Sequence, residues 1–183
     1  MPKENIVLIG GRGTGKSTIA CLLADCLSRD LFVMDELIVQ KAGLSIPELV
    51  ASHGWQYFRE LEAQVAGDLS QVNNAVIDCG GGVVCEQDQA GQQTYSERKV
   101  DLFKTSGLIV WLDCDLAEQV RRVENQTGRP ALTVGSISAS EELEGVMRLR
   151  RPWYERAADL VVKTDNRSPQ QVVEEIVRKM GDF

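Results

Sequence analysis

One stretch decides the fold: Gly10-Gly11-Arg12-Gly13-Thr14-Gly15-Lys16-Ser17, which satisfies the phosphate-loop pattern G-x-x-x-x-G-K-[S/T]. Its glycines let the backbone curl around phosphate oxygens with the N–H groups pointing inward. The helix that begins here directs its partial positive end at the same anion. Lys16 neutralises charge on the β- and γ-phosphates of ATP, and Ser17 coordinates Mg²⁺. We therefore predict nucleotide binding, with this ATP-binding set: Gly11, Gly13, Thr14, Gly15, Lys16, Ser17 and Thr18.

The segments on both sides of the loop fit this assignment. Residues 6–9 form a continuous apolar run, typical of a strand buried on both faces, and 16–27 have a helical apolar spacing. Further apolar runs at 31–34, 75–77, 108–112 and 160–162 predict four more strands. Helices are predicted at 45–54 and 55–72 and from positions 116, 141 and 168. Strands that alternate with helices predict one α/β domain over 1–183, with a parallel sheet covered on both faces.

Two stretches, 86–97 and 125–140, are too polar for a core. The second contains Gly128, Arg129 and Gly135 between predicted helices, so we predict a mobile lid there. The first falls in a region, 85–107, that we expect to be a surface loop.

Composition excludes several classes of protein. The net charge of −7 and pI of about 4.8, without a basic stripe, argue against nucleic acid as a partner. The five cysteines are scattered and fit neither a zinc site nor a disulfide framework. No signal peptide or membrane-length apolar run is present, so we expect a cytoplasmic protein with no membrane partner. We also expect a monomer.

Motifs beyond the loop appear in a characteristic order along the whole chain: Asp35-Glu36, Gly43-x-Ser45-Ile46, His53-Gly54, Phe58-Arg59-Glu60-x-Glu62, Gly80-Gly81-Gly82-Val83-Val84, Arg129-Pro130 and 150–159. At these residues the sequence resembles the shikimate kinase family of P-loop small-molecule kinases. The resemblance implies ATP-dependent phosphorylation of the 3-hydroxyl of shikimate, with Mg²⁺ as cofactor. It also implies a three-layer P-loop kinase fold with five parallel strands, a lid at about 125–140 and an acceptor-binding region at about 35–62.

The resemblance also implies roles for individual residues. On the acceptor side, Asp35 is similar to the carboxylate that hydrogen-bonds the acceptor hydroxyls. Arg59 and Arg150 are similar to the pair that grips the acceptor carboxylate, and Gly80, Gly81 and Gly82 to the loop that approaches the ring. On the ATP side, Arg129 resembles a lid arginine that reaches the transferring phosphate, and Arg122 an arginine near the adenine. Lys16, Asp35 and Arg129 form the implied catalytic set.

The chemistry of these residue types agrees, because paired arginines make a specific, permanently charged clamp for one carboxylate. A carboxylate just after a strand lies at the sheet edge where open α/β folds bind ligands. Three alternatives stay open at this point. Arg59 can form a solvated surface pair with its glutamate neighbours, Arg148 or Arg151 can point inward in place of Arg150, and Asp35 can simply start a helix.

The sequence departs from the family pattern in two places. The family carries Asp-x-Asp after the second strand, but the first position here is Val33, which offers no oxygen to a hard cation. Asp78, at the end of the third predicted strand, resembles a Walker B aspartate, and we predict that it replaces the missing Mg²⁺ contact. The alternative is that Ser17 and water suffice. The region 85–107 also looks longer than its family counterpart.

Two rival functions remain. A related kinase acting on another carboxylate-bearing polyol, such as gluconate, would use the same clamp, although the histidine common after the second strand of gluconate kinases is missing near Asp35. Val33 and the longer region also permit a weakly active, ATP-binding regulatory relative.

Overall fold

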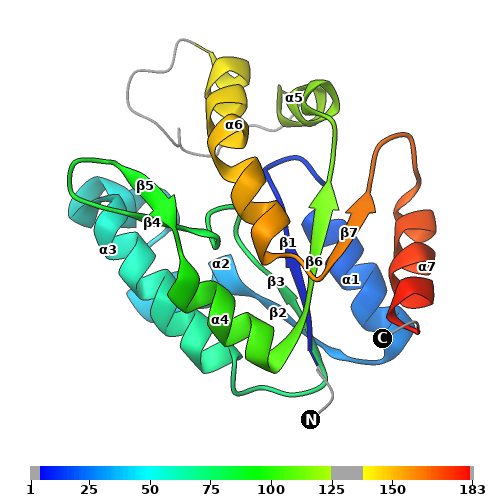
Figure 1. Ribbon diagram of the computed structural model, residues 1–183. Helices are drawn as coiled ribbons and strands as arrows, with labels where there is room; N and C mark the ends of the chain where they lie inside the picture. The colour runs from blue at the N-terminus through cyan, green and yellow to red at the C-terminus, as the bar shows by residue number, and fades with distance from the viewer. Residues whose placement is uncertain (1–4, 125–137, 182–183) are drawn as a thin grey trace.

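The computed structural model describes residues 5–124 and 138–181, and a five-stranded sheet crosses its centre (Figure 1). In chain order the elements are β1 (Asn5–Ile9), α1 (Lys16–Leu27), β2 (Asp30–Val33), α2 (Met34–Ala42), α3 (Ile46–Leu69), β3 (Ala75–Asp78), β4 (Cys85–Gln87), β5 (Gln93–Tyr95), α4 (Glu97–Ser106), β6 (Gly107–Asp113), α5 (Leu116–Glu124), α6 (Ala139–Ala157), β7 (Leu160–Lys163) and α7 (Pro169–Met180).

The five strands are parallel and follow the order β2-β3-β1-β6-β7, so β1 lies at the centre between β3 and β6. The loops that follow β1, β2 and β3 therefore lie together at the carboxyl ends of the strands. This is the edge at which open parallel sheets bind ligands. The expectation of a parallel α/β sheet with helices on both faces is confirmed.

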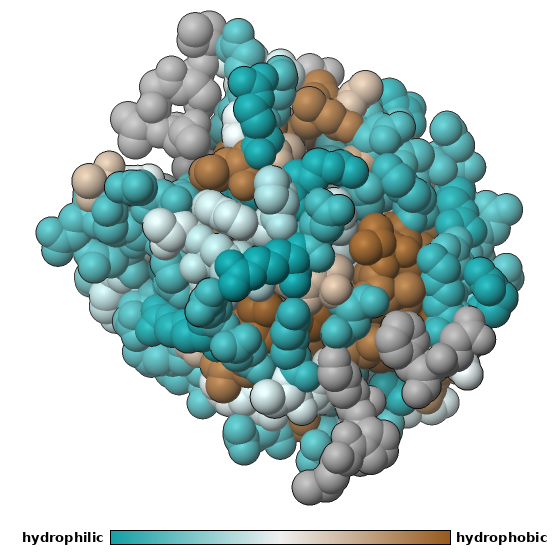
Figure 2. All heavy atoms as spheres, viewed as in Figure 1, coloured by the Kyte–Doolittle hydropathy of each residue, from teal (hydrophilic) through white to brown (hydrophobic). Residues whose placement is uncertain are grey.

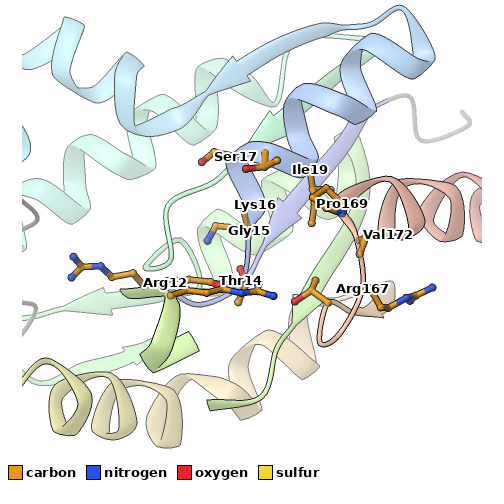
Figure 3. Close-up of a pocket in the computed structure, with 13 residues that line it drawn as sticks. Arg12, Thr14, Gly15, Lys16, Ser17, Ile19, Arg167, Pro169 and Val172 are labelled. Carbon is orange, nitrogen blue, oxygen red and sulfur yellow. Dashed lines mark hydrogen bonds between the residues drawn. The ribbon is translucent and has the colours of Figure 1, made fainter. Parts of the chain in front are cut away.

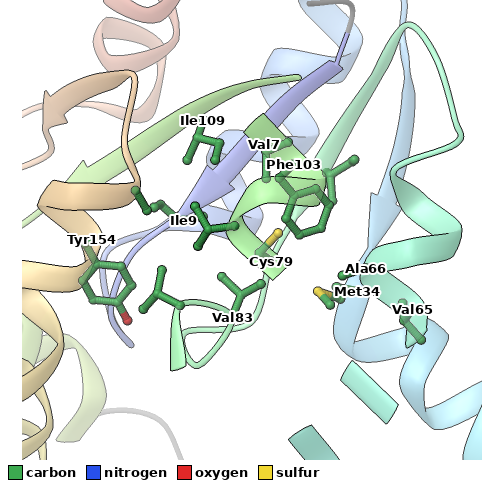
Figure 4. Close-up of a cluster of buried hydrophobic side chains, with 14 of the residues drawn as sticks. Val7, Ile9, Met34, Val65, Ala66, Cys79, Val83, Phe103, Ile109 and Tyr154 are labelled. Carbon is green, nitrogen blue, oxygen red and sulfur yellow. The ribbon is translucent and has the colours of Figure 1, made fainter. Parts of the chain in front are cut away.

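Alternate strand residues face opposite layers of the core. Val7 and Ile9 of β1 pack in the cluster formed with α2, α3, α4 and α6, whereas Ile6 and Leu8 pack in the cluster formed with α1 and α7. Figure 4 shows the first cluster, with the β1 residues beside Phe103, Met34 and Tyr154. Both faces of β1 are thus sealed from water, which explains its unbroken apolar sequence.

Two predicted boundaries need correction. The predicted strand 31–34 ends at Val33, because Met34 opens α2. The predicted helices 45–54 and 55–72 form one element, α3, interrupted at Gly54, where φ is 80° and ψ is 168°. Only glycine adopts that conformation at little cost, so Gly54 marks the kink that the sequence indicated as a break.

The expected surface loop at 85–107 is wrong. Strands β4 and β5 form an antiparallel hairpin, with Gly91 at φ 84° in the connection, and α4 follows. Val100 and Phe103 of α4 enter the core, and Lys99 is fully enclosed. The polar composition of this region led to the wrong expectation. Lysine is almost always exposed, so nothing in the sequence indicated that Lys99 is buried.

The outer surface fits the charged fraction of 26%, which is typical of a globular protein. The face in Figure 2 is mostly hydrophilic, with apolar residues appearing in separate places. Within residues 5–124 and 138–181, no helix is long and apolar enough to cross a membrane. The five cysteines are free thiols, and Cys79, Cys85 and Cys114 are buried.

Candidate active site

The phosphate loop follows central strand β1 and leads into α1, as the motif requires. Gly13 has φ 81°, and a Cβ there would lie 2.9 Å from the carbonyl oxygen of Gln119, so both the dihedral and the space demand glycine. Lys16 folds back over the loop, where its Nζ donates to the carbonyl oxygens of Gly10 at 2.9 Å and Gly11 at 3.0 Å. The Thr14 hydroxyl donates to Gly11 O at 3.0 Å. These bonds hold the loop closed around the space for phosphate.

A cavity of about 570 Å³ opens beside the loop, and residues from both the loop and α7 line it (Figure 3). The lining contains most of the predicted ATP-binding set, namely Gly13, Thr14, Gly15, Lys16, Ser17 and Thr18, whereas Gly11 lines a second cavity. Its size suits a nucleotide, since ligand pockets commonly hold about 300–1,000 Å³.

Arg122 lies at this cavity, as predicted. Its Nε donates to Glu118 at 2.8 Å, and its Nη1 donates to Gly13 O at 3.2 Å. Hydrogen bonds from Arg121 and Arg122 lower the pKa of Glu118 to about 2, so this carboxylate stays charged and holds Arg122 against the loop. Sequence reasoning missed six lining residues: Thr164 and Arg167 from the connection between β7 and α7, Pro169 and Val172 of α7, Ile19 of α1, and Arg12 of the loop.

A second cavity of about 350 Å³ shares Arg12 and Lys16 with the first. Lys16 therefore stands where the two spaces meet. Predicted acceptor residues from four parts of the chain line this cavity together: Asp35, Arg59, Gly80, Gly81, Gly82 and Arg150. The geometry thus brings the expected acceptor side directly beside the expected phosphate side.

Arg59 is buried, with only 3% of its surface exposed, so the alternative of a solvated surface pair is excluded. Its Nη1 donates to Glu62 Oε2 at 2.8 Å, and its guanidinium lies 5.4 Å from the ring centre of Trp55 and 5.0 Å from that of Phe58. Burial lowers the pKa of Arg59, but Glu62 more than compensates and raises it above the ordinary value. Arg59 is a fixed cation in an apolar wall.

Arg150, and not a neighbouring arginine, lines the cavity. Its Nε donates to Gln93 at 3.0 Å and its Nη1 to Gly81 O at 3.2 Å. Arg148 pairs with Glu144 on the surface, and Arg151 pairs with Asp113.

Tyr154 stands one helical turn after Arg150 and also donates to Gly81 O. Burial raises the pKa of Tyr154 to about 12, so the phenol keeps its proton. Arg150 and Tyr154, both on α6, thus hold the glycine loop by hydrogen bonds to the same carbonyl oxygen, that of Gly81.

The triple glycine allows close approach of two functional side chains. A Cβ on Gly80 would lie 2.6 Å from Asp35 Oδ1, and a Cβ on Gly82 would overlap the guanidinium of Arg59. Asp35 occupies the first turn of α2 and lines the cavity, so it both starts a helix and faces the acceptor space.

Asp78 is 5% exposed and pairs in register with Val33 across β2 and β3. In a parallel pair, aligned residues point to the same face of the sheet. Asp78 therefore places a carboxylate on the same face of the sheet as Val33, the position at which the family carries an aspartate. Neither cavity has Asp78 among the described residues that line it. Arg129 and nearly all of the predicted lid lie outside the described residues.

Comparison with known proteins gives concordant matches. The family model described as shikimate kinase matches residues 12–181. A shikimate kinase of Leptospira biflexa is 33% identical over 97% of this chain and 96% of its own length. A shikimate kinase of Shewanella frigidimarina is 36% identical over 98% of both chains.

Solved structures agree. The shikimate kinase of Acinetobacter baumannii in complex with shikimate aligns with a TM-score of 0.85 at 25% identity, covering 99% of this chain and 94% of the other. The shikimate kinase of Aquifex aeolicus aligns with a TM-score of 0.78 at 32% identity, covering 97% and 96%.

Proposed function

The chain belongs to the shikimate kinase family, and we infer that it transfers the γ-phosphoryl group of ATP to the 3-hydroxyl of shikimate, giving shikimate 3-phosphate and ADP. One observation carries the assignment of the site. Lys16 lines both cavities, so a phosphate held by the loop and an acceptor held beside Arg59 and Arg150 would meet at its ammonium. Phosphoryl transfer depends mainly on such positioning and on charge stabilisation.

On the acceptor side, we propose that Arg59 and Arg150 hold the carboxylate of shikimate. Each guanidinium already has protein partners that fix its plane, and each retains a buried nitrogen without a hydrogen-bond partner, Nε of Arg59 and Nη2 of Arg150. A planar, preorganised donor loses little freedom when it binds a carboxylate. The Gly80–Gly82 backbone supplies the wall on which the ring would rest.

On the phosphate side, we propose that Asp35 accepts the proton of the attacking hydroxyl while the hydroxyl oxygen bonds to the γ-phosphorus and the bond to the β-phosphate oxygen breaks. Lys16 would stabilise the charge that builds on the transferring group. The backbone N–H groups of residues 13–18 would hold the ADP product. Arg129 stays a proposed contact to the same phosphate.

For the cofactor, the donor set fits Mg²⁺, since the Ser17 hydroxyl lines the ATP cavity and the Asp78 carboxylate lies at the adjacent sheet edge. When bound, Mg²⁺ neutralises charge on the β- and γ-phosphates. We propose that Asp78 would orient the ion's hydration shell, in place of the aspartate that the family carries where this chain has Val33.

Replacing Asp78 by Asn tests this assignment. We expect the Mg²⁺ concentration for half-maximal activity to rise about tenfold, because outer-shell partners of a metal commonly contribute 10- to 100-fold. Restoring the family arrangement in the double variant Val33→Asp/Asp78→Asn should reverse the shift. An unchanged Mg²⁺ dependence in Asp78→Asn would favour Ser17 and water as sufficient.

The activity is tested by measuring ADP release with shikimate, with gluconate and without acceptor. We expect turnover with shikimate alone. Turnover with gluconate alone would establish the related polyol kinase, and no turnover with either acceptor would establish an inactive relative. We propose that the monomer is active, which size-exclusion chromatography of the active fraction checks.

A further inference from the structure

Lys99 is a buried cation behind the wall of the acceptor cavity, and its role is not explained by packing. It lies on α4, in the region 85–107, and has no exposed surface. Its Nζ donates to Glu62 Oε2 at 2.7 Å and to the carbonyl oxygen of Cys85 at 2.6 Å. A buried lysine is costly unless it is paired, so this arrangement requires Glu62 to be charged.

The same oxygen of Glu62 also accepts the hydrogen bond from Arg59 Nη1 at 2.8 Å. One carboxylate therefore lies between two cations, and all three side chains are at most 4% exposed. Burial raises the pKa of Glu62, but the nearby Arg59 and Lys99 lower it below its ordinary value. The trio keeps one net positive charge, and the one further carboxylate near Lys99 among the described residues, Glu86 at 3.8 Å, is partly exposed and is itself paired with Arg98.

This charge balance matters for an anionic acceptor. Without Lys99, the pair of Arg59 and Glu62 would be neutral, and the Glu62 carboxylate would repel an incoming carboxylate nearly as much as Arg59 attracted it. With Lys99 present, its ammonium neutralises the charge of Glu62 from the side away from the acceptor cavity. Lys99 does not line the acceptor cavity, whereas its partner Glu62 does, so Lys99 reaches the acceptor through Glu62 and not by direct contact.

We propose that Lys99 is a positioning residue for acceptor binding: it neutralises Glu62 and so leaves the charge of Arg59 to the carboxylate of the acceptor. This assignment rests on the proposed function, because it needs an acceptor with a carboxylate. The hairpin before α4 supports the other arm of the clamp, since Gln93 of β5 accepts the hydrogen bond from Arg150. The region 85–107 thus holds both arginines.

The test compares kinetics of the wild-type chain with Lys99→Met, Lys99→Arg, and the double variant Glu62→Gln/Lys99→Met. Methionine keeps the length and apolar stem of lysine but removes the charge. The double variant again leaves one net charge, that of Arg59, because glutamine and methionine are both neutral. Its glutamine also retains an oxygen that can accept from Arg59. Lys104→Met is the matched control, since Lys104 lies on the same helix and donates to Arg156 O at 3.3 Å on the surface.

We expect Lys99→Met to raise the KM for shikimate roughly ten- to fiftyfold, the size of a unit charge acting over several ångströms at an effective dielectric constant near 20. The kcat and the KM for ATP should change less than about threefold, because the phosphate loop is untouched. Lys99→Arg, the double variant and Lys104→Met should stay within about fivefold of wild type. With the methyl ester of shikimate, which has no charge, Lys99→Met should bind as well as wild type by calorimetry.

Three results would overturn the assignment: an unchanged KM for shikimate in Lys99→Met, an equal rise in the KM for ATP, or a double variant weaker than the single one. If Lys99→Met does not fold, the double variant decides alone, because its buried charges are balanced as in wild type. Wild-type turnover of shikimate is measured first. No turnover would overturn the proposed function and this assignment with it, whereas turnover without an effect of Lys99 would overturn the assignment only.

Discussion

Replacing Gly82 by Ala should weaken acceptor binding through Arg59. A Cβ on Gly82 would overlap the Arg59 guanidinium, with Cζ only 2.5 Å away. The guanidinium has little room to retreat, because Glu62 holds one side and the rings of Trp55 and Phe58 pack on it. The new methyl group must therefore shift either the arginine or the glycine loop.

The size of the effect follows from the contacts at stake. Removing one partner of a buried ion pair costs about 3–5 kcal/mol, and forcing an extra methyl group into a packed site costs about 1–3 kcal/mol. Here Arg59 and Glu62 both remain, and loop and side chain share the displacement. We therefore expect a loss of about 2 kcal/mol in acceptor binding, which corresponds to a KM for shikimate about thirtyfold higher.

Initial rates of ADP formation measure this, first with shikimate varied at saturating ATP and then with ATP varied. The KM for ATP should stay within about twofold, because Gly82 is not among the described residues that line the ATP cavity. Gly67→Ala is the matched control. Nothing lies within 4 Å of a Cβ at Gly67, which is in α3, so that change should leave kinetics unaltered and stabilise the helix by up to about 1 kcal/mol.

A folded Gly82→Ala protein whose KM for shikimate equals that of wild type would refute the reasoning. It would mean that Arg59 moves freely in its site or does not hold the acceptor. A second experiment separates these explanations. If Arg59→Met also leaves that KM unchanged, the arginine has no part in binding; if it raises the KM, the arginine binds the acceptor but tolerates the methyl group.

Three further predictions concern neighbouring residues. Gly80→Ala would press on Asp35 Oδ1 at 2.6 Å, so initial rates should show kcat falling about tenfold to a hundredfold, with little change in the KM for ATP. Arg167→Ala should raise the KM for ATP about threefold to tenfold and leave that for shikimate unaltered, because Arg167 lines only the ATP cavity. Burial raises the pKa of Tyr154 to about 12, above its ordinary value near 10, so the stability that the neutral phenol contributes is complete below pH 10 and lost as pH rises to 12. Urea unfolding at pH 9 and pH 11.5 should show wild type losing about 2 kcal/mol more than Tyr154→Phe.

Sequence patterns identified most of the central sheet because β1, β3 and β6 are buried along their whole length and contain apolar runs, and the outer strands β2 and β7 contain short apolar runs as well. The phosphate loop was equally readable, since its chemistry needs fixed residue types at fixed spacing. Lys99 carried no such signal. Its burial depends on Glu62, which lies 37 positions away in the chain, and a polar segment cannot reveal which of its charges has a partner inside.

The choice among Arg148, Arg150 and Arg151 shows a similar limit. All three lie within four residues on α6, and successive residues of a helix point about 100° apart, so the three side chains point in different directions. Which one faces inward depends on the phase of α6 against the sheet, and that phase is set by contacts distant in sequence, such as Arg151 with Asp113 and Arg150 with Gln93. The sequence could predict that an arginine enters the cavity and could only favour Arg150.

The buried charges also explain how an acidic chain can bind two anions. With a net charge of −7, the long-range field opposes both ATP and a carboxylate. Among the described residues, five cations line the acceptor cavity or lie just behind it, namely Arg12, Lys16, Arg59, Arg150 and Lys99. The first two also line the ATP cavity, and the last three are nearly fully buried. Water and salt screen buried charges far less than surface charges, so these groups dominate at contact distance even though the surface repels. Selectivity then comes from the fixed geometry of the arginines. An anion that does not fit between them makes no close contact with these cations, and the negative long-range field of the protein repels it.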